Sequence, residues 1–300
     1  MSGDRAPCPL CAAPSGLRLR RRGYPIYRCA ACDFEFVHPV PTAAEIADCY
    51  EGDYFSGPGL GYGDYFGAER TTSDEKARVR LACLGELGCR SGRLLDVGCA
   101  DGRFLRAARQ QGFDCTGVEI SERARAELPD ELRGAVFASL DQALGAEPFE
   151  LVTLWDTLEH LPDPLGTLRA IRHQLAPTAL VAVVVPVIDN VNARLWPRSW
   201  DQYKPPEHLW FFSRRALRRT LERELDAELM LEQGAWRREA RCWQVGLGHP
   251  RPLGVGRAEA ALWRRAERLG WVAPAALEDS ALLVVRHRSA AHAAATEREP

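Results

Sequence analysis

Runs of apolar residues alternate with amphipathic, helix-like segments along the chain from residue 93 onward. Apolar runs of strand length are followed by segments whose apolar residues recur with the period of a helix. The predicted strands are 93–99, 114–121, 135–140, 149–156, 179–187, 229–237 and 281–288. The predicted helices are 103–112, 122–129, 163–176, 213–228 and 258–270. This alternation predicts an α/β fold with a Rossmann-like, doubly wound, mostly parallel sheet and helices on both faces.

The first 90 residues do not continue this pattern. A helix start is predicted at Thr42, with Glu45 three residues on as its capping partner, and a second helix over 72–87 with Ser73 as a cap. Between them, residues 50–66 contain five glycines and six aromatic residues, which is too much glycine for a helix and indicates an aromatic loop or lid. The expected organisation is a zinc ribbon (1–40), a helical and aromatic lid with linker (41–90), a core (91–289) and a disordered tail (290–300).

Composition narrows the expected partners. The net charge of −2 over 300 residues provides no general attraction to nucleic acid or to an anionic membrane. The longest apolar run, 179–188, has about half the length that a membrane span needs. The N-terminus has no apolar signal core. We therefore expect a cytoplasmic protein with no membrane or nucleic-acid partner.

The segment LLDVGCADGRF, residues 94–104, lies where the first core strand turns into the first helix. In a doubly wound sheet, ligands bind at the carboxyl ends of the strands near such a turn. Gly98 and Gly102 are four residues apart, whereas the outer glycines of the dinucleotide fingerprint are five apart. Asp96 would repel a pyrophosphate but would favour a cationic ligand such as S-adenosylmethionine. Glu119, at the end of the second strand, is placed to accept hydrogen bonds from ribose hydroxyls.

The sequence resembles class I S-adenosylmethionine-dependent methyltransferases in DVGCADG, GVEIS, FELVTLWDTLEHLPDP and PPEHLWFFSRRAL. It is most similar to bacterial small-molecule methyltransferases with an N-terminal zinc-binding segment, over most of residues 5–225. The resemblance implies that the methionine part is surrounded by Asp96, Gly98, Ala100 and Gly102, with Cys99 and Phe104 in the same cofactor site. It also implies that Glu119 holds the ribose, that Ile120 lies against the adenine, and that Trp155 and Asp156 line the cofactor or substrate side.

Two positions depart from the family pattern. Ala100 stands where the family usually has a glycine, which is tolerable if its φ angle is negative. The third strand lacks a clear acidic residue for the adenine amino group, so Asp141, or the backbone at Leu140, is the expected substitute.

Two CxxC pairs, Cys8/Cys11 and Cys29/Cys32, are separated by 17 residues, a spacing typical of zinc sites. Four thiolates close a tetrahedral shell and leave no open position, so a structural Zn²⁺ is expected rather than a catalytic one. An iron site of similar geometry or redox thiols are the alternatives.

Two Glu-His pairs follow strands that are expected to end at the site: Glu159-His160 and Glu207-His208. Histidine exchanges protons near neutral pH, so His208, Glu207 and His160 are the candidate catalytic residues. Loop packing or helix capping is the structural alternative. Glu207-His208 also resembles the acid–histidine pair of zinc-containing sugar C-methyltransferases, but we expect no sugar-holding domain here and therefore no nucleotide-sugar substrate.

Aromatic side chains are the candidates for substrate binding: Tyr54, Tyr62 and Tyr65 in the glycine-rich loop, and Tyr203 in a second aromatic cluster. Packing in the core or on the ribbon is the alternative. The expected function is methyl transfer from S-adenosylmethionine to an oxygen, nitrogen or carbon atom of a small molecule, in specialised or cell-surface metabolite biosynthesis. The alternatives are a protein or RNA methyltransferase that docks through its ribbon, and a cofactor-binding protein without catalysis.

Overall fold

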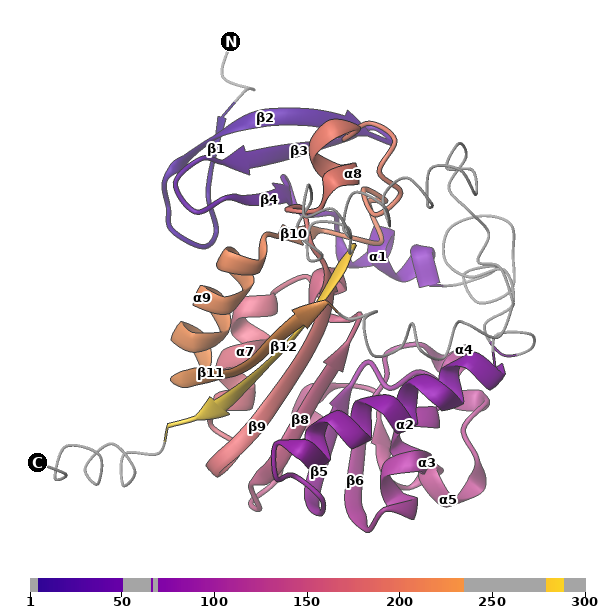
Figure 1. The fold of residues 1–300 in the computed structure, drawn as a ribbon. Helices are drawn as coiled ribbons and strands as arrows, with labels where there is room; N and C mark the ends of the chain where they lie inside the picture. The colour runs from indigo at the N-terminus through magenta and orange to yellow at the C-terminus, as the bar shows by residue number, and fades with distance from the viewer. Residues whose placement is uncertain (1–4, 51–65, 67–69, 235–278, 289–300) are drawn as a thin grey trace, which may run out of the picture.

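A computed structural model describes residues 5–50, 66, 70–234 and 279–288. Seven strands form the larger sheet, in the order β11-β12-β9-β8-β5-β6-β7 (Figure 1). Its strands are β5 (Gly92–Val97), β6 (Phe113–Val118), β7 (Val136–Phe137), β8 (Phe149–Trp155), β9 (Leu175–Pro186), β11 (Ala227–Gly234) and β12 (Ser280–His287). Strands β5 to β9 pair in parallel, and β12 and β11 add antiparallel strands at the β9 edge. The predicted fold class is confirmed.

Helices cover both faces of this sheet because its strands are apolar on both sides. Leu94 packs with residues of α2 (Arg70–Glu86) and α3 (Arg103–Gln110), whereas the next residue, Leu95, packs in the cluster of α7 (Pro164–Arg172) and α9 (Arg214–Leu225). Four shorter helices join the strands: α4 (Glu122–Ala126), α5 (Asp130–Arg133), α6 (Leu140–Ala143) and α8 (Val191–Leu195). The order of the strands reverses between β5 and β8, which places a ligand-binding crevice at their carboxyl ends.

Local signals account for several helix ends. Thr42 and Glu45 form the predicted capping box before α1 (Ala43–Tyr50), with Glu45 Oε2 accepting from Thr42 N at 2.8 Å. Ser213 Oγ accepts from Ala216 N at 3.1 Å and caps α9, as expected. Helix α2 begins at Arg70, so the predicted cap at Ser73 is wrong: this residue lies inside the helix. The predicted helix 258–270 and tail 290–300 lie outside the described residues.

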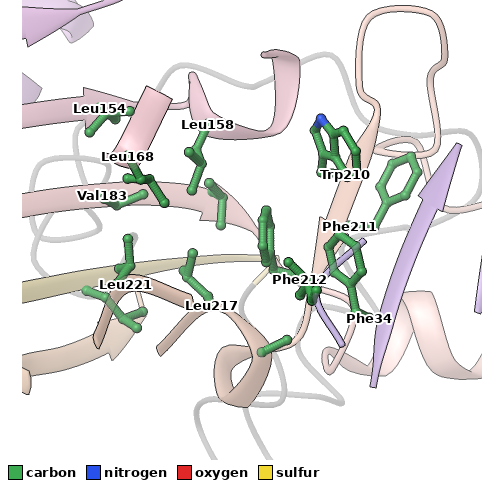
Figure 2. Packing of buried hydrophobic residues seen from close by; sticks show 14 of the residues in the cluster. Phe34, Leu154, Leu158, Leu168, Val183, Trp210, Phe211, Phe212, Leu217 and Leu221 are labelled. Carbon is green, nitrogen blue, oxygen red and sulfur yellow. The ribbon is translucent and has the colours of Figure 1, made fainter. Parts of the chain in front are cut away.

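A second sheet of five antiparallel strands contains the ribbon, in the order β1-β2-β3-β4-β10. Its strands are β1 (Arg5–Pro7), β2 (Pro14–Arg21), β3 (Tyr24–Cys29), β4 (Phe34–Val37) and β10 (Trp210–Phe212). The last of these comes from far along the chain and pairs Phe212 with Phe34. Figure 2 shows Phe34, Phe211 and Phe212 close to one another, with Leu217 of α9 on the side toward Phe212 and Leu221 further along the helix. The ribbon is thus joined to the core by both pairing and packing.

Candidate active site

A cavity of about 360 Å³ lies over the carboxyl ends of β5, β6 and β8. This volume falls within the range of roughly 300–1,000 Å³ that is usual for small-molecule sites. One end is formed by the turn after β5 and by residues that follow β6 and β7; we call it the donor end. The other end is formed by α1 and by the 3₁₀ helix η2 (Leu158–His160) with the residues after it; we call it the acceptor end.

The turn after β5 is shaped by two glycines with positive φ angles. Gly98 (φ 78°) lines the cavity, and a Cβ atom there would lie 2.4 Å from Thr157 Oγ1. Gly102 (φ 77°) precedes α3, and a Cβ atom there would lie 2.7 Å from Leu132 Cδ1. Gly102 does not line the cavity. Glycine is therefore required at both positions, at Gly98 for the cavity floor and at Gly102 for packing.

Ala100 lines the same cavity but has a φ of 48°, so the condition under which alanine would be tolerated without strain, a negative φ, is not met. Its backbone N–H donates to Glu119 Oε2 at 2.9 Å, which draws the turn toward the end of β6. An alanine in this left-handed conformation is strained, typically by about 1 kcal/mol. In this conformation the backbone amide of Ala100 points at the Glu119 carboxyl.

Glu119 forms the wall of the cavity at the end of β6. Its second carboxylate oxygen, Oε1, accepts from Ser121 N at 2.7 Å, so backbone amides hold both oxygens in place. Burial raises the pKa of Glu119, and these two backbone hydrogen bonds oppose that rise. The result is a fixed carboxyl group at the cavity with oxygen lone pairs to spare.

Asp96 lies beneath the floor and does not line the cavity. Its Oδ1 accepts from Thr153 Oγ1 at 2.7 Å. Burial raises the pKa of Asp96 to about 7, against the hydrogen bond from Thr153 and the charge of Arg80, both of which lower it. A cation bound above the floor would favour the ionised form of this carboxyl.

The residues predicted for the adenine side lie at the ends of β6 and β7. Ile120 is 61% exposed although it is a large apolar residue, and it lines the cavity beside Ser139 and Leu140. An apolar side chain in this position can cover one face of a planar ring. Asp141 is exposed and does not line the cavity, so of the two expected adenine contacts only Leu140 is placed there.

Trp155 and Asp156 line the middle of the cavity. Arg80 of α2 reaches them from another part of the chain: its Cζ lies 4.5 Å from the Trp155 ring centroid, and its Nη2 lies 3.4 Å from Asp156 Oδ2. Phe104 packs against Trp155 at 5.2 Å between ring centroids rather than lining the cavity, and Cys99 is likewise buried outside the lining. Sequence reasoning missed Arg80, because one arginine among many on a helix carries no signal of its own.

The acceptor end brings both Glu-His pairs together. His160 lines the cavity, and its Nδ1 lies 2.9 Å from Tyr50 Oη. His208 lies behind it, with the two imidazole centroids 4.5 Å apart, and Glu159 is buried next to both. Burial lowers the pKa of His160 to about 3 and that of His208 well below its ordinary value, and it raises the pKa of Glu159.

The remaining candidates lie elsewhere. Glu207 is buried outside the cavity lining, with its Oε1 2.6 Å from Lys204 Nζ. Tyr203 is also buried, and its hydroxyl donates to Glu35 of β4, so the predicted substrate contact is wrong and the residue joins ribbon to core. Tyr54, Tyr62 and Tyr65 lie outside the described residues.

The four ribbon cysteines converge. Their Sγ atoms are 3.5 Å apart for Cys8–Cys32 and for Cys11–Cys29, and 3.7 Å apart for Cys11–Cys32. Sulfurs around a tetrahedral zinc lie about 3.8 Å apart, given a Zn–S length of about 2.3 Å. The two CxxC turns also share a backbone pattern, with Ala12 N donating to Cys8 O and Asp33 N to Cys29 O. The donor set therefore fits a closed, structural zinc site.

Fold and site define a doubly wound α/β domain with a small-molecule cavity across the switch point of its sheet. A family model described as "Methyltransferase domain" matches residues 69–224, more than half of the chain. The chain therefore belongs to the methyltransferase-domain family, and the predicted class is confirmed.

The matched relatives are similar to only part of the chain. A ubiquinone biosynthesis O-methyltransferase of Histophilus somni (strain 2336) is 32% identical over 101 residues, which cover 30% of this chain and 42% of the relative. One of Xylella fastidiosa (strain M23) is 26% identical over 153 residues, covering 42% and 59%. The chain thus spans about half the length of the curated relatives it matches.

One solved structure supports the fold. A chain from the complex between the Haloferax volcanii Trm112 methyltransferase activator and a methyltransferase has a TM-score of 0.53. It is 15% identical, with 75% of this chain and 95% of that chain covered, a likeness that concerns the fold alone. Among the residues that the structure describes, no helix is long and apolar enough to cross a membrane.

Proposed function

We propose that the protein transfers a methyl group from S-adenosylmethionine to a small-molecule acceptor. The observation that carries the proposal is the Glu119 carboxyl, which the Ala100 and Ser121 amides fix at the cavity wall beside the exposed Ile120. A fixed carboxyl next to an apolar surface suits a ribose attached to an adenine ring. Membership in the methyltransferase-domain family supports the same ligand.

The donor end also suits the charge of this ligand. Glu119 and Asp156 line the cavity, Asp96 lies beneath its floor, and S-adenosylmethionine carries both a sulfonium and an ammonium group that these carboxyl groups would attract. Arg80, which lies beside Asp156, provides a positive charge near the place where the methionine carboxylate would lie. The bound cofactor supplies an electrophilic methyl group on a positively charged sulfur. The protein has to hold the acceptor in line with that methyl group and keep water out.

We place the acceptor at the end formed by Ile46, Tyr50, His160 and Leu161. Two apolar side chains and two ring-bearing polar ones suit a hydroxylated ring compound. The relatives named ubiquinone biosynthesis O-methyltransferase support an oxygen nucleophile. Of the three residues predicted to be catalytic, His160 faces the acceptor, whereas His208 and Glu207 lie behind it and act as positioning residues.

We propose, in addition, that Cys8, Cys11, Cys29 and Cys32 hold one structural Zn²⁺. The spacing of their sulfurs supports this assignment. All four positions of the metal would be filled by thiolates, so this ion would stabilise the ribbon and take no part in methyl transfer.

The test is the affinity for S-adenosylmethionine, measured by titration calorimetry. Glu119→Ala should weaken binding roughly 100-fold, because it removes two charge-assisted hydrogen bonds worth about 1.5 kcal/mol each. The matched control is Glu122→Ala, an exposed glutamate at the start of α4, which should bind within about twofold of wild type. Wild-type affinity in Glu119→Ala would refute the site. Transfer of labelled methyl groups to a panel of hydroxylated aromatics then tests the acceptor class.

A further inference from the structure

Three side chains at the acceptor end form a compact set of metal ligands. Glu159, His160 and His208 each offer a ligand atom, and these atoms lie within 4.8 Å of one another. Glu159 Oε1 is 3.8 Å from His160 Nε2. The set is built from two segments about fifty residues apart in sequence, which are joined by a hydrogen bond of 2.9 Å from Leu209 N to Glu159 O. Backbone pairing therefore holds the set together.

The histidines are oriented by their second nitrogens. His208 Nδ1 lies 3.1 Å from the carbonyl oxygen of Gln202, which can only accept, so Nδ1 must donate and Nε2 must carry a lone pair. His160 Nδ1 is engaged by the Tyr50 hydroxyl at 2.9 Å. In His208, Nε2 is therefore the nitrogen left for a ligand. The His160 imidazole also hydrogen-bonds the backbone of Glu207, so a metal that binds it would displace a proton. A hydrogen bond at the distal nitrogen is the usual way in which a metal-binding histidine is held.

The Glu159 carboxyl supplies the second, independent observation. It is 1% exposed, and apart from a contact with its own backbone amide neither of its oxygens has a hydrogen-bond partner among the described residues. A buried carboxylate without hydrogen bonds costs several kcal/mol unless a cation accompanies it. The nearby ammonium group of Lys204 is paired with Glu207 Oε1 at 2.6 Å. Ligand atoms of Glu159, His160 and His208 thus lie within 4.8 Å of one another, around a buried carboxyl whose charge Lys204 does not neutralise by direct pairing.

We propose that Glu159, His160 and His208 bind one divalent transition-metal ion, at a site separate from the four cysteines. Two imidazoles and one carboxylate are a ligand set that Zn²⁺ and Fe²⁺ accept, with at least one position left open. Ligand atoms around a tetrahedral ion lie about 3.3 Å apart, given bonds of about 2.0 Å. The present separations reach up to 4.8 Å, so the three side chains would have to draw together around the ion. The ion would reach the site through the cavity, which His160 lines.

This metal would tie together α1, η2 and the chain that leads into β10. Tyr50 is linked through His160, Gln202 through His208, and Leu209 through the backbone of Glu159. It would fix the imidazole of His160 at the acceptor wall. The proposal does not depend on methyl transfer, because metal binding is measured without cofactor or acceptor.

The experiment compares metal content and cobalt spectra of the full chain. Elemental analysis of protein equilibrated with Zn²⁺ should find two ions per chain. After replacement with Co²⁺, the cysteine site should show thiolate-to-cobalt charge-transfer bands, and the second site should add ligand-field absorption without them. Glu159→Gln and His208→Asn should each lose one ion and retain the thiolate bands. The control His173→Asn, an exposed histidine after α7, should retain both ions.

Three results would overturn the proposal: a single ion per wild-type chain, a second ion that survives both substitutions, or a second ion lost in His173→Asn. The thiolate bands report whether each variant keeps its ribbon folded. If His208→Asn loses them, the nearly isosteric Glu159→Gln decides. The proposed function is tested separately, since calorimetry with S-adenosylmethionine should give wild-type affinity in Glu159→Gln.

Discussion

The two ends of the cavity are built in opposite ways. At the donor end, both oxygens of Glu119 are bound by backbone amides, and the turn that supplies one of them follows directly from β5. At the acceptor end, Glu159 is buried with neither oxygen bonded among the described residues apart from a contact with its own backbone amide, next to two neutral imidazoles. The Glu119 carboxyl at the donor end is hydrogen-bonded in the absence of a ligand, whereas the Glu159 carboxyl at the acceptor end would gain its partner only from a bound ion.

The two ends also depend on different supports. The donor end rests on β5, β6 and the helices that follow them, all within one stretch of the chain. The acceptor end rests on the ribbon sheet, because β10 pairs with β4 and Val37 N donates to Leu209 O at 2.9 Å. Loss of ribbon structure should therefore damage the acceptor end first.

The largest expected effect comes from Cys29→Ser, which removes one ligand of the cysteine cluster. Structural zinc contributes on the order of 10 kcal/mol to the folding of zinc-finger peptides, so the ribbon should unfold. Hydrogen exchange should increase in β3, β4 and β10. Affinity for S-adenosylmethionine should stay within about threefold of wild type, because the donor end is built on β5, β6 and the segments after them rather than on the ribbon sheet, and methyl transfer should be lost.

The control is Cys89→Ser, which removes a partly buried thiol far from the cluster and should leave zinc content and exchange unchanged. If Cys29→Ser both unfolded the ribbon and strongly weakened cofactor binding, both ends of the cavity would depend on the ribbon. The division into donor and acceptor ends would then be wrong.

Asp96→Asn should have the next largest effect and should depend on pH. Burial raises the pKa of Asp96 from 3.8 to about 7, so between these values the folded state binds a proton that the unfolded state lacks. Wild-type stability should therefore fall as pH rises through this window, by at most roughly 4 kcal/mol at 1.36 kcal/mol per unit. Asparagine does not ionise. The free energy of unfolding of the variant should therefore rise relative to that of wild type between pH 5 and pH 8, as measured by urea unfolding.

The same substitution should weaken binding of the cationic cofactor, since a counter-charge is lost. Gained stability and lost affinity together would mark Asp96 as a functional carboxyl at a structurally unfavourable place. Asp114→Asn, at an exposed position of β6, should change neither quantity by more than about 0.5 kcal/mol. A pH-independent difference between Asp96→Asn and wild type would show that the carboxyl is ionised throughout this range.

The contrast between the ends explains what the sequence could predict. Asp96, Gly98 and Ala100 lie in one segment, and Glu119 follows at the end of the next strand, so local patterns identified the donor end. The acceptor end needs Tyr50, Glu159 and His208 from three distant segments. Their contact depends on β10 joining the ribbon sheet, a pairing that no local pattern predicts. The ribbon cysteines were predictable because spacing alone carries their chemistry.

The smallest expected effect is a gain in stability from Ala100→Gly, which tests the left-handed conformation of the turn at the donor end. Ala100 has a φ of 48°, where glycine is unstrained. Relief of that strain should outweigh the added freedom of the unfolded chain and stabilise the protein by up to about 1 kcal/mol. The control Ala107→Gly, inside α3, should cost about 0.5–1 kcal/mol instead. Affinity for S-adenosylmethionine should remain near wild type, because the amide that binds Glu119 is retained. If Ala100→Gly were destabilising, the turn would not hold a left-handed residue, and the hydrogen bond that sets the Glu119 carboxyl would have to come from elsewhere.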